Sequence, residues 1–303
     1  MLLGQIALAT PERLPEFQSL HLGLATQYQK SDSNFATDGA ATDFLNSGQP
    51  SSFREMSLGL IADYGFARDW SAKFNLNFVS GFVDSQTGSG TFHSGAGISQ
   101  VGLGVKWRLM QRTPNIILEN AILFPGGGDT PKATGDLVLQ EGGTQYLLAL
   151  HTGYRINQLI FYLSPAFRAR FGGYSSRVEL HSGLQISLLP VYINLFSDLK
   201  LSLSESAFPD SSLFVHDVSG AGGSYARLTG SPSNFNLGAM VSMRLGRQFY
   251  PGIYFAQTLW GIRAPNGYQA GVKLNINLDF FNPVEKTRLK EVPLEGDNSV
   301  NLY

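Results

Sequence analysis

The segment YQAGVKLNINLDF, residues 268–280, carries apolar or aromatic side chains at every even position and polar side chains or glycine at every odd one. Successive side chains of a β-strand point to opposite faces, so this period of two predicts a strand with one apolar and one polar face. Strands of soluble sheets usually run about five or six residues, and this segment is longer. Its length favours a strand that crosses a membrane at a tilt.

The same alternation recurs along most of the chain. It predicts twelve strands, over residues 20–28, 56–64, 70–78, 101–109, 115–124, 144–155, 158–171, 175–188, 191–204, 234–246, 251–263 and 267–281. A tilted membrane-spanning strand requires about 9–11 residues, which matches these lengths. We therefore expect an all-β fold, namely a transmembrane, antiparallel, up-and-down β-barrel of about twelve strands, with about ten to fourteen compatible with the pattern.

The connections between the predicted strands alternate in length. Those after even-numbered strands are short, and those after odd-numbered strands are often long and polar, over residues 30–54, 84–97, 125–143 and 205–233. Two odd-side connections, near Gly172-Gly173 and Pro265-Asn266-Gly267, are expected to be tight. Outer-membrane barrels have short periplasmic turns and long extracellular loops, so both termini are expected in the periplasm.

Three parts of the chain follow from this pattern. They are an N-terminal arm or signal remnant (residues 1–18), the transmembrane barrel (residues 19–281) and a periplasmic C-terminal tail (residues 282–303).

The composition narrows the function classes. A net charge of −1 provides no global basic field of the kind that nucleic-acid-binding proteins use. The absence of cysteine excludes thiolate metal sites, disulfides and a cysteine nucleophile. No apolar run approaches the roughly 20 residues that a membrane helix requires. We expect no cofactor, no metal site and no nucleic-acid partner.

The last predicted strand carries a pattern that outer-membrane proteins use. It has a polar residue, a glycine two positions later, two alternating hydrophobic residues and a final aromatic, at Gln269, Gly271, Leu274, Ile276 and Phe280. This pattern resembles the C-terminal assembly signal of bacterial outer-membrane barrels, although residues 282–303 extend beyond it. The resemblance implies insertion by the barrel-assembly machinery into a Gram-negative outer membrane, in contact with lipid and lipopolysaccharide.

A second resemblance lies near the middle of the chain. LFPGGGD (residues 123–129) is followed by a polar loop, by GGTQYLLAL (residues 142–150) and by GYR (residues 153–155). This strand–loop–strand unit resembles the outer-membrane proteins of meta-pathway phenol degradation, which are similar to the fatty-acid transporter superfamily. The resemblance implies transport of a small solute, although the Asn-Pro-Ala plug signature of that superfamily does not occur in the sequence.

The inward faces of the predicted strands carry charges of both signs and lean basic. The predicted lumen or pore lining comprises Lys73, Lys106, Arg108, Glu119, His151, Arg155, Arg168, Arg170, Arg177, Glu179, His181, Asp198, Lys200, Arg244 and Lys273. Two interpretations stay open: a salt-bridged network that fills the bore, and a lining that handles anions selectively.

The hairpin at Gly172-Gly173 permits a prediction of register. A tight turn there pairs residues whose numbers sum to about 345, which sets Arg168 opposite Arg177. Like charges directly opposite destabilise a sheet, so an acid or anion should offset them, and Glu179 is the nearest candidate. With Arg170 also inward, we expect a net positive patch in the extracellular half of the lumen.

Two inward histidines raise the question of catalysis. His151 and His181 are expected level with Ser164 on the strand between them, roughly 10 Å apart, which is too far to share one metal ion. Neither a residue that would orient an imidazole nor an oxyanion hole can be identified. An outer-membrane phospholipase would place its Ser and His on the lipid-facing wall, and no such pair is found. We expect the protein not to be an enzyme.

Pro165 lies within the predicted strand 158–171 and faces outward. Proline removes a donor from the backbone ladder, so it marks either a weak point in the wall or a harmless bulge.

These observations lead to one function hypothesis and two competitors. The leading hypothesis is a passive outer-membrane channel or transporter for small solutes, either anionic or aromatic and hydrophobic. The first competitor is a closed structural barrel whose loops 30–54 and 205–233 bind a partner or ligand. The second is an outer-membrane lipid hydrolase.

Overall fold

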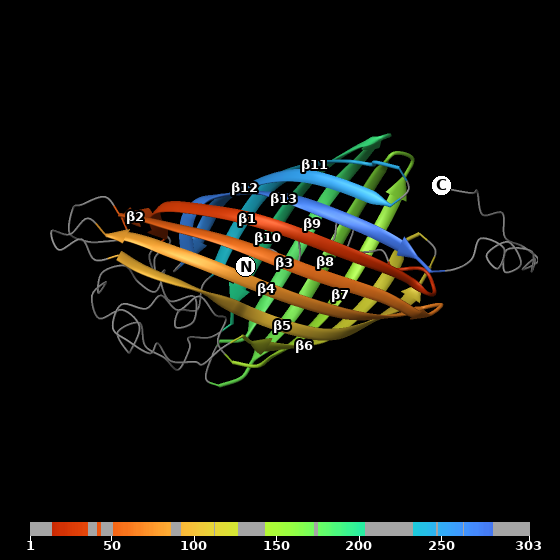
Figure 1. Ribbon diagram of the computed structural model, residues 1–303, viewed down its shortest axis with the longest axis horizontal. Coiled ribbons are helices and arrows are strands. Elements are labelled where there is room, and N and C mark those ends of the chain that lie inside the picture. The colour runs from red at the N-terminus through yellow and green to blue at the C-terminus, as the bar shows by residue number, and fades with distance from the viewer. Residues whose placement is uncertain are drawn as a thin grey trace, which may run out of the picture.

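The chain forms a closed antiparallel β-barrel (Figure 1). The computed structural model describes residues 14–35, 41–43, 51–85, 92–111, 113–126, 143–172, 175–203, 233–246, 248–262 and 264–280. Within these residues there are thirteen strands and no helix. No helix in the described part of the chain is long and apolar enough to cross a membrane.

Twelve of the strands build the wall. In chain order the strands are β1 (Ser19–Phe35), β2 (Ala41–Asp43), β3 (Ser51–Ala67), β4 (Trp70–Ser85), β5 (Phe92–Met110), β6 (Asn115–Pro125), β7 (Gln145–Ile156), β8 (Leu159–Arg170), β9 (Arg177–Leu188), β10 (Val191–Ser202), β11 (Ser233–Met243), β12 (Phe249–Ile262) and β13 (Ala264–Asp279). The three-residue strand β2 pairs with the end of β1 and lies outside the ring.

The barrel closes between its first and last strands. β1 pairs with β13 from Ser19↔Asp279 to Phe35↔Ala264, with one irregularity near Ser31. Closure leaves no sheet edge, so every wall strand has two neighbours for its backbone donors and acceptors, which is the condition for crossing a bilayer with strands. The predicted fold, a barrel of about twelve antiparallel strands, is confirmed.

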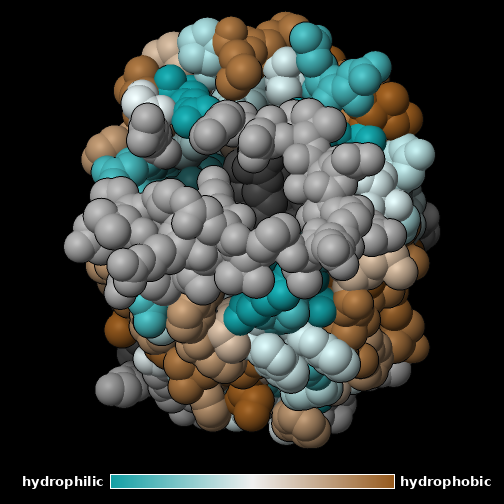
Figure 2. Space-filling model, turned by 90° about the vertical axis from the view of Figure 1, so that its right-hand side faces the viewer, coloured by the Kyte–Doolittle hydropathy of each residue, from teal (hydrophilic) through white to brown (hydrophobic). Residues whose placement is uncertain are grey.

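The wall has two chemically different faces. On β5, Leu103 and Trp107 are exposed on the outside, whereas Lys106 between them points inward and is completely buried. Forty-two large hydrophobic side chains are exposed among the described residues, far more than the isolated patches that soluble monomers show. Viewed onto the turn end, hydrophobic residues form much of the outer wall (Figure 2).

Aromatic side chains lie on the outside near the short turns. Trp70 of β4 stacks on Trp107 of β5, with ring centroids 5.2 Å apart and planes 4° from parallel. The two residues are direct partners in the β4–β5 register. Such pairs suit a membrane interface, where a large amphipathic ring contacts both lipid and water.

The short turns occur after the even-numbered strands of the predicted barrel, as the alternating loop lengths of the sequence predict. They join β3 to β4, β5 to β6, β7 to β8, β9 to β10 and β11 to β12, at the end of the barrel that we call the turn end. The opposite end, where the long connections lie, is the loop end.

At the loop end several strands are longer than predicted. β1 runs to Phe35 and β3 begins at Ser51, so both ends of the predicted loop 30–54 are strand, and β5 likewise begins within the predicted loop 84–97. The alternation stops earlier because only the lipid-facing part of a strand requires an apolar face. The backbone ladder continues without it, as at Ser31, which still pairs with β13.

The predicted tight turn at Pro265-Asn266-Gly267 is wrong. β12 ends at Ile262 and β13 begins at Ala264, so these three residues lie within β13. Pro265 pairs with Asn34 of β1 rather than forming a corner. A proline is tolerated there because it lies at the beginning of the strand, where the ladder with β12 has already ended at Gln257↔Tyr268.

The N-terminal segment 14–18 packs against the turn end. Leu14 is buried, and the Gln18 backbone N–H donates to the Gly65 carbonyl at 2.6 Å. Gly65 faces inward, and a β-carbon at this position would overlap the Glu16 carbonyl, so the segment lies against the inner side of the wall. The rest of the predicted arm, residues 1–13, and the predicted tail, residues 282–303, lie outside the described residues.

Candidate functional site: the charged barrel interior

Twelve of the fifteen predicted lining residues are buried inside the barrel. They are Lys73, Lys106, Glu119, His151, Arg168, Arg170, Arg177, Glu179, His181, Asp198, Lys200 and Lys273. The other three lie at the turn end. Arg155 and Arg244 each donate to a turn carbonyl two residues away, at Asn157 and Gly246, and Arg108 lies 3.8 Å from Asp69.

A first group of charges, which we call the lysine cluster, consists of Asp63, Lys73, Lys106, Glu119 and His151. Lys106 Nζ lies 2.8 Å from Asp63 Oδ2, and Lys73 Nζ lies 2.7 Å from Glu119 Oε1. His151 Nε2 lies 3.0 Å from the second oxygen of the same carboxylate, Glu119 Oε2. Glu119 therefore ties β4 and β7 to β6.

Each lysine of this cluster reaches past its neighbouring strand. Asp63 of β3 pairs with Lys106 of β5, and Lys73 of β4 pairs with Glu119 of β6. The space for the second crossing comes from a glycine on the inward face of the intervening strand, β5. Gly104 of β5 is the register partner of Lys73, and a β-carbon on Gly104 would press against Ala121 of β6.

A second group, the arginine cluster, consists of Arg168, Arg170, Arg177, Glu179 and Lys200 near the loop end of β8, β9 and β10. Arg168 lies opposite Arg177, as the hairpin register predicts. Glu179 lies between them: its Oε1 is 2.9 Å from Arg168 Nε and 2.7 Å from Arg177 Nε. Its Oε2 accepts a hydrogen bond from Arg168 Nη2 at 3.0 Å. The expectation that Glu179 offsets the facing arginines is therefore confirmed.

The remaining members of the arginine cluster add positive charge. Lys200 is the register partner of Glu179 across β9 and β10, and Arg170 donates to the Ser175 carbonyl at 3.5 Å. Gln145 accepts a further hydrogen bond from Arg168 Nη1 at 3.2 Å. Two of the cluster's four cations, Arg168 and Arg177, thus contact the Glu179 carboxylate directly.

A row of polar side chains lies between the two clusters. Ser164 of β8, His181 of β9 and Asp198 of β10 are direct register partners. His181 Nδ1 lies 2.5 Å from Asp198 Oδ1, and the Tyr162 ring stacks on the imidazole with centroids 5.1 Å apart. His181 is therefore held by both a carboxylate and an aromatic ring.

Asp198 is the imidazole-orienting residue that the sequence analysis did not identify. The signal was present in the Leu189-Pro190 turn, because Val191 pairs with Leu188 and the same arithmetic sets Asp198 opposite His181. Ser164 Oγ, however, makes no hydrogen bond. The row therefore lacks the Ser–His contact of a hydrolytic triad. No group of three or more metal-ligand side chains occurs among the described residues.

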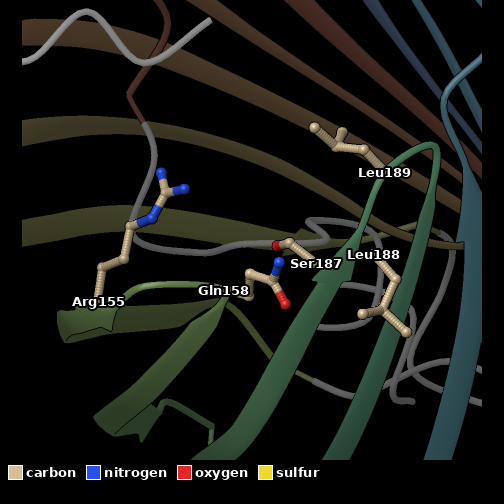
Figure 3. A pocket seen from close by; sticks show the side chains of 5 residues that line it. All are labelled: Arg155, Gln158, Ser187, Leu188 and Leu189. Atoms are coloured by element: carbon tan, nitrogen blue, oxygen red, sulfur yellow. The ribbon is translucent and has the colours of Figure 1, made fainter.

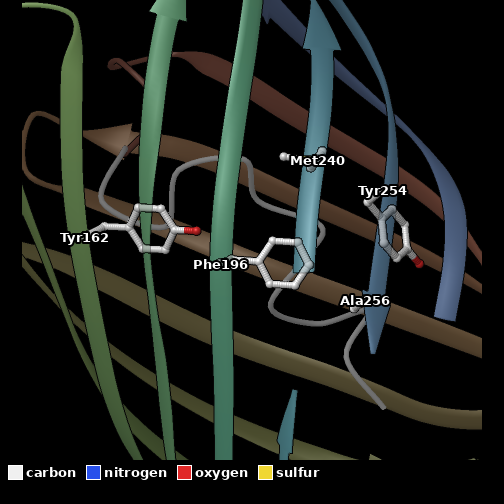
Figure 4. Close-up of a cluster of buried hydrophobic side chains, with 5 residues drawn as sticks. All are labelled: Tyr162, Phe196, Met240, Tyr254 and Ala256. Carbon is white, nitrogen blue, oxygen red and sulfur yellow. The ribbon is translucent and has the colours of Figure 1, made fainter. Parts of the chain in front are cut away.

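One stretch of the inner wall is apolar. Tyr162, Phe196, Met240, Tyr254 and Ala256 form a buried cluster on β8, β10, β11 and β12 (Figure 4). Its two tyrosines also make polar contacts: Tyr162 donates to Asn194 Oδ1 at 2.9 Å, and Tyr254 donates to Gln27 Oε1 at 3.3 Å. The inner face of the barrel therefore has a stretch of apolar and tyrosine side chains in addition to the charged lysine and arginine clusters.

Several inward polar atoms have no protein partner. They include Asp63 Oδ1, His151 Nδ1, Ser164 Oγ, Asp198 Oδ2 and both side-chain polar atoms of Asn236. A buried polar group that lacks a hydrogen bond costs about 1–3 kcal/mol. Such groups are normally satisfied by ordered water.

The charged interior can be compared with known proteins. No protein-family model and no curated protein matches the chain. Among solved structures, the COG4313 outer membrane channel from Pseudomonas putida F1 superposes with a TM-score of 0.56 over 88% of this chain and 97% of that one, at 12% identity. The two chains share a fold. Identity this low shows the fold alone, so the predicted family resemblance stays a prediction.

Two further barrels have lower similarity. The NanC porin gives a TM-score of 0.49 at 8% identity, over 86% of this chain and all (100%) of that one. A FadL homologue from Pseudomonas aeruginosa gives 0.40 at 10% identity, over 87% of this chain and 91% of that one.

The wall itself is interrupted at Pro165. The β7–β8 register runs from Gln145↔Arg170 to Ala149↔Ala166 and resumes at Thr152↔Leu163, with no pair for Leu150 or His151. Pro165 still pairs with Leu180 on its other side. The predicted interruption of the ladder thus lies between β7 and β8.

An open pocket of about 450 Å³ lies at the turn end (Figure 3). It is lined by Arg155, Gln158, Ser187, Leu188 and Leu189. This set contains one cation, one amide and one hydroxyl, and it provides neither a nucleophile–base pair nor a metal-ligand set.

Proposed function

We propose that this protein is an outer-membrane channel that passes small solutes through a hydrated, charged lumen. One observation carries the proposal. The outer wall is apolar, whereas several buried polar atoms of the interior have no hydrogen-bond partner in the protein. The first feature suits lipid and the second suits water.

The outer wall supports a membrane location. Residues such as Leu148, Phe167 and Ile253 are exposed on strands whose inward neighbours are buried. In water such an apolar surface would promote aggregation, whereas in a bilayer it contacts the lipid hydrocarbon. The likeness in fold to an outer-membrane channel supports the outer membrane in particular.

Assembly by the barrel machinery is part of the proposal. Phe280 is 60% exposed directly after β13, and Gln269 is buried on the inward face of that strand. These positions fit the predicted assembly signal, with its aromatic residue on the outside at the turn end.

The interior supports passage of small solutes only. Eight strands close into a barrel whose interior is filled by side chains, and porins of about 16–18 strands enclose a wide aqueous channel. A ring of twelve strands lies between these limits. The long side chains of the lysine and arginine clusters narrow it further, so we expect a strong dependence on solute size.

Swelling of proteoliposomes tests this function. Vesicles that contain the folded barrel should admit small sugars and amino acids, at rates that fall at least about tenfold from pentose to disaccharide, because the lumen is narrow. Vesicles that contain the same protein after heat denaturation are the control.

Absence of swelling with the smallest solutes, from protein that still shows the gel shift of a folded barrel, would contradict the channel. That outcome would favour the closed structural barrel. Release of fatty acids from the vesicle lipid would instead indicate the hydrolase.

A further inference from the structure

A carboxylate and an amide lie on neighbouring strands of the inner wall, β10 and β11. Asp198 and Asn236 are direct register partners, and each is 1% exposed. Asp198 Oδ1 contacts His181. Within the described part of the chain, Asp198 Oδ2, Asn236 Oδ1 and Asn236 Nδ2 have no hydrogen-bond partner. The pair therefore presents three unsatisfied polar atoms to the lumen.

The backbone next to this pair is irregular. The register between β11 and β12 shifts between Phe235 and Asn236, and the consecutive residues Leu259 and Trp260 of β12 are both exposed on the outer wall. A β-bulge changes the direction of nearby side chains and occurs often beside functional sites. Asn236 therefore lies where the wall departs from regular pairing.

The three atoms restrict the chemistry of a ligand. A carboxylate oxygen only accepts hydrogen bonds, whereas an amide offers both an acceptor and a donor. A cation would leave the Asn236 donor unsatisfied, and an anion would lie against the Asp198 carboxylate. A hydroxyl group both donates and accepts. Because the β-carbons of directly opposite residues are about 4.5–5.5 Å apart, two neighbouring hydroxyls of one solute can bind both side chains.

Aromatic rings lie next to the pair on the same inner face. Phe196 precedes Asp198 by two residues on β10, and its ring covers Gly238 of β11, where a β-carbon would overlap the ring. Figure 4 shows this ring extending from β10 toward β11. The centroid of the His181 imidazole lies 5.1 Å from that of the Tyr162 ring and 6.2 Å from that of the Phe196 ring. Small-molecule sites commonly combine such a surface with a few polar groups.

We infer that Asp198, Asn236 and the ring of Phe196 form a binding site in the lumen for a neutral polyhydroxylated solute, such as a monosaccharide or a sugar alcohol. The inference rests on the proposed channel function and assigns a solute class to it. Two neighbouring hydroxyls of the solute bind the carboxylate and the amide in place of ordered water, and its C–H groups lie against the aromatic ring. Hydration that the solute loses in the narrow lumen is thereby replaced.

Block of the ionic current in planar bilayers tests the site. Xylose should reduce the potassium chloride current of the wild-type protein in a saturable way, because a bound sugar occupies the lumen. Triethylene glycol has the same mass but lacks neighbouring hydroxyls along its chain, so it should reduce the current only through viscosity, in proportion to its concentration. The half-saturating concentration of xylose measures the strength of binding.

Two variants and a matched control assign the block to these residues. Asn236→Leu keeps the approximate volume but removes both polar atoms, and it should raise the half-saturating concentration at least about tenfold through the loss of two hydrogen bonds. Phe196→Leu should raise it about threefold through the loss of apolar contact. The control is Asn75→Leu, the same change at another buried amide, on β4. It should leave the half-saturating concentration unchanged.

The outcomes distinguish the inference from the function. A current that xylose and triethylene glycol reduce alike, or a half-saturating concentration that Asn236→Leu changes no more than Asn75→Leu, would overturn the polyol site and leave the channel standing. A stronger saturable block by serine than by xylose would assign the pair to amino acids and would also overturn the polyol site. No current from folded wild-type protein would overturn the channel, and the site with it. Each variant is first checked for the heat-dependent gel shift of a folded barrel.

Discussion

Replacing Glu119 by alanine is expected to lower the free energy of unfolding by about 3–5 kcal/mol, because Lys73 and His151 then lose the carboxylate that holds them in a buried position. Breaking one partner of a buried pair is costly since the remaining charge keeps its desolvation penalty. Urea unfolding of the barrel in lipid vesicles, followed by the fluorescence of its three tryptophans, measures the change.

Two comparisons make this test specific. Asp69→Ala removes an exposed turn acid that lies 3.8 Å from Arg108, and it should cost less than about 0.5 kcal/mol. The double variant Lys73→Met/Glu119→Leu removes both partners and should lose less stability than Glu119→Ala alone. If Glu119→Ala costs no more than Asp69→Ala, the lysine cluster does not hold the wall strands together.

An arginine on the outer wall should destabilise the barrel according to its depth in the bilayer. Leu148 is the fourth of the twelve residues of β7 and is exposed between Tyr146, near the loop end, and Tyr154, which is exposed near the turn end. Leu148→Arg should cost about 2–4 kcal/mol, whereas Tyr154→Arg should cost about 0–1 kcal/mol.

The same unfolding assay reports both variants, so each serves as the matched control for the other. Equal and small costs at the two positions would mean that this face does not contact hydrocarbon. The lipid-spanning interpretation of the apolar wall would then fail.

Whether the sequence predicts the register of two neighbouring strands depends on the length of the connection between them. Tight turns fix the register, so Arg168 opposite Arg177 could be predicted from Gly172-Gly173 alone. Asp198 opposite His181 was equally accessible through the Leu189-Pro190 turn. In both cases a short loop leaves one arrangement of the pairs.

Contacts across long connections could not be predicted in this way. Glu119 and His151 lie on β6 and β7, which are joined through residues 126–144, and a loop of that length leaves the register open. Lys73 and Glu119 lie on strands that are not neighbours, so their contact depends on the curvature of the wall and the reach of lysine. The alternating pattern places each of these side chains inside but does not assign its partner.

The full lengths of β1, β3 and β5 could also not be predicted from the sequence pattern. Apolar alternation marks the lipid-facing part of each strand, whereas β1, β3 and β5 extend beyond the predicted strands toward the loop end. Backbone hydrogen bonds form there irrespective of side chains, so composition favoured a loop where the structure has a strand.

Access of a small ion to Ser164 tests the hydrated lumen most directly. The chain has no cysteine, so Ser164→Cys introduces one thiol in the row between the two charged clusters, and Leu163→Cys introduces one on the outer wall. Silver ions added to the reconstituted barrel should protect the Ser164→Cys thiol from a fluorescent maleimide applied after denaturation, and should leave the Leu163→Cys thiol reactive. A Ser164→Cys thiol that stays fully reactive after silver treatment would mean that the interior is dry and closed, and would contradict the channel.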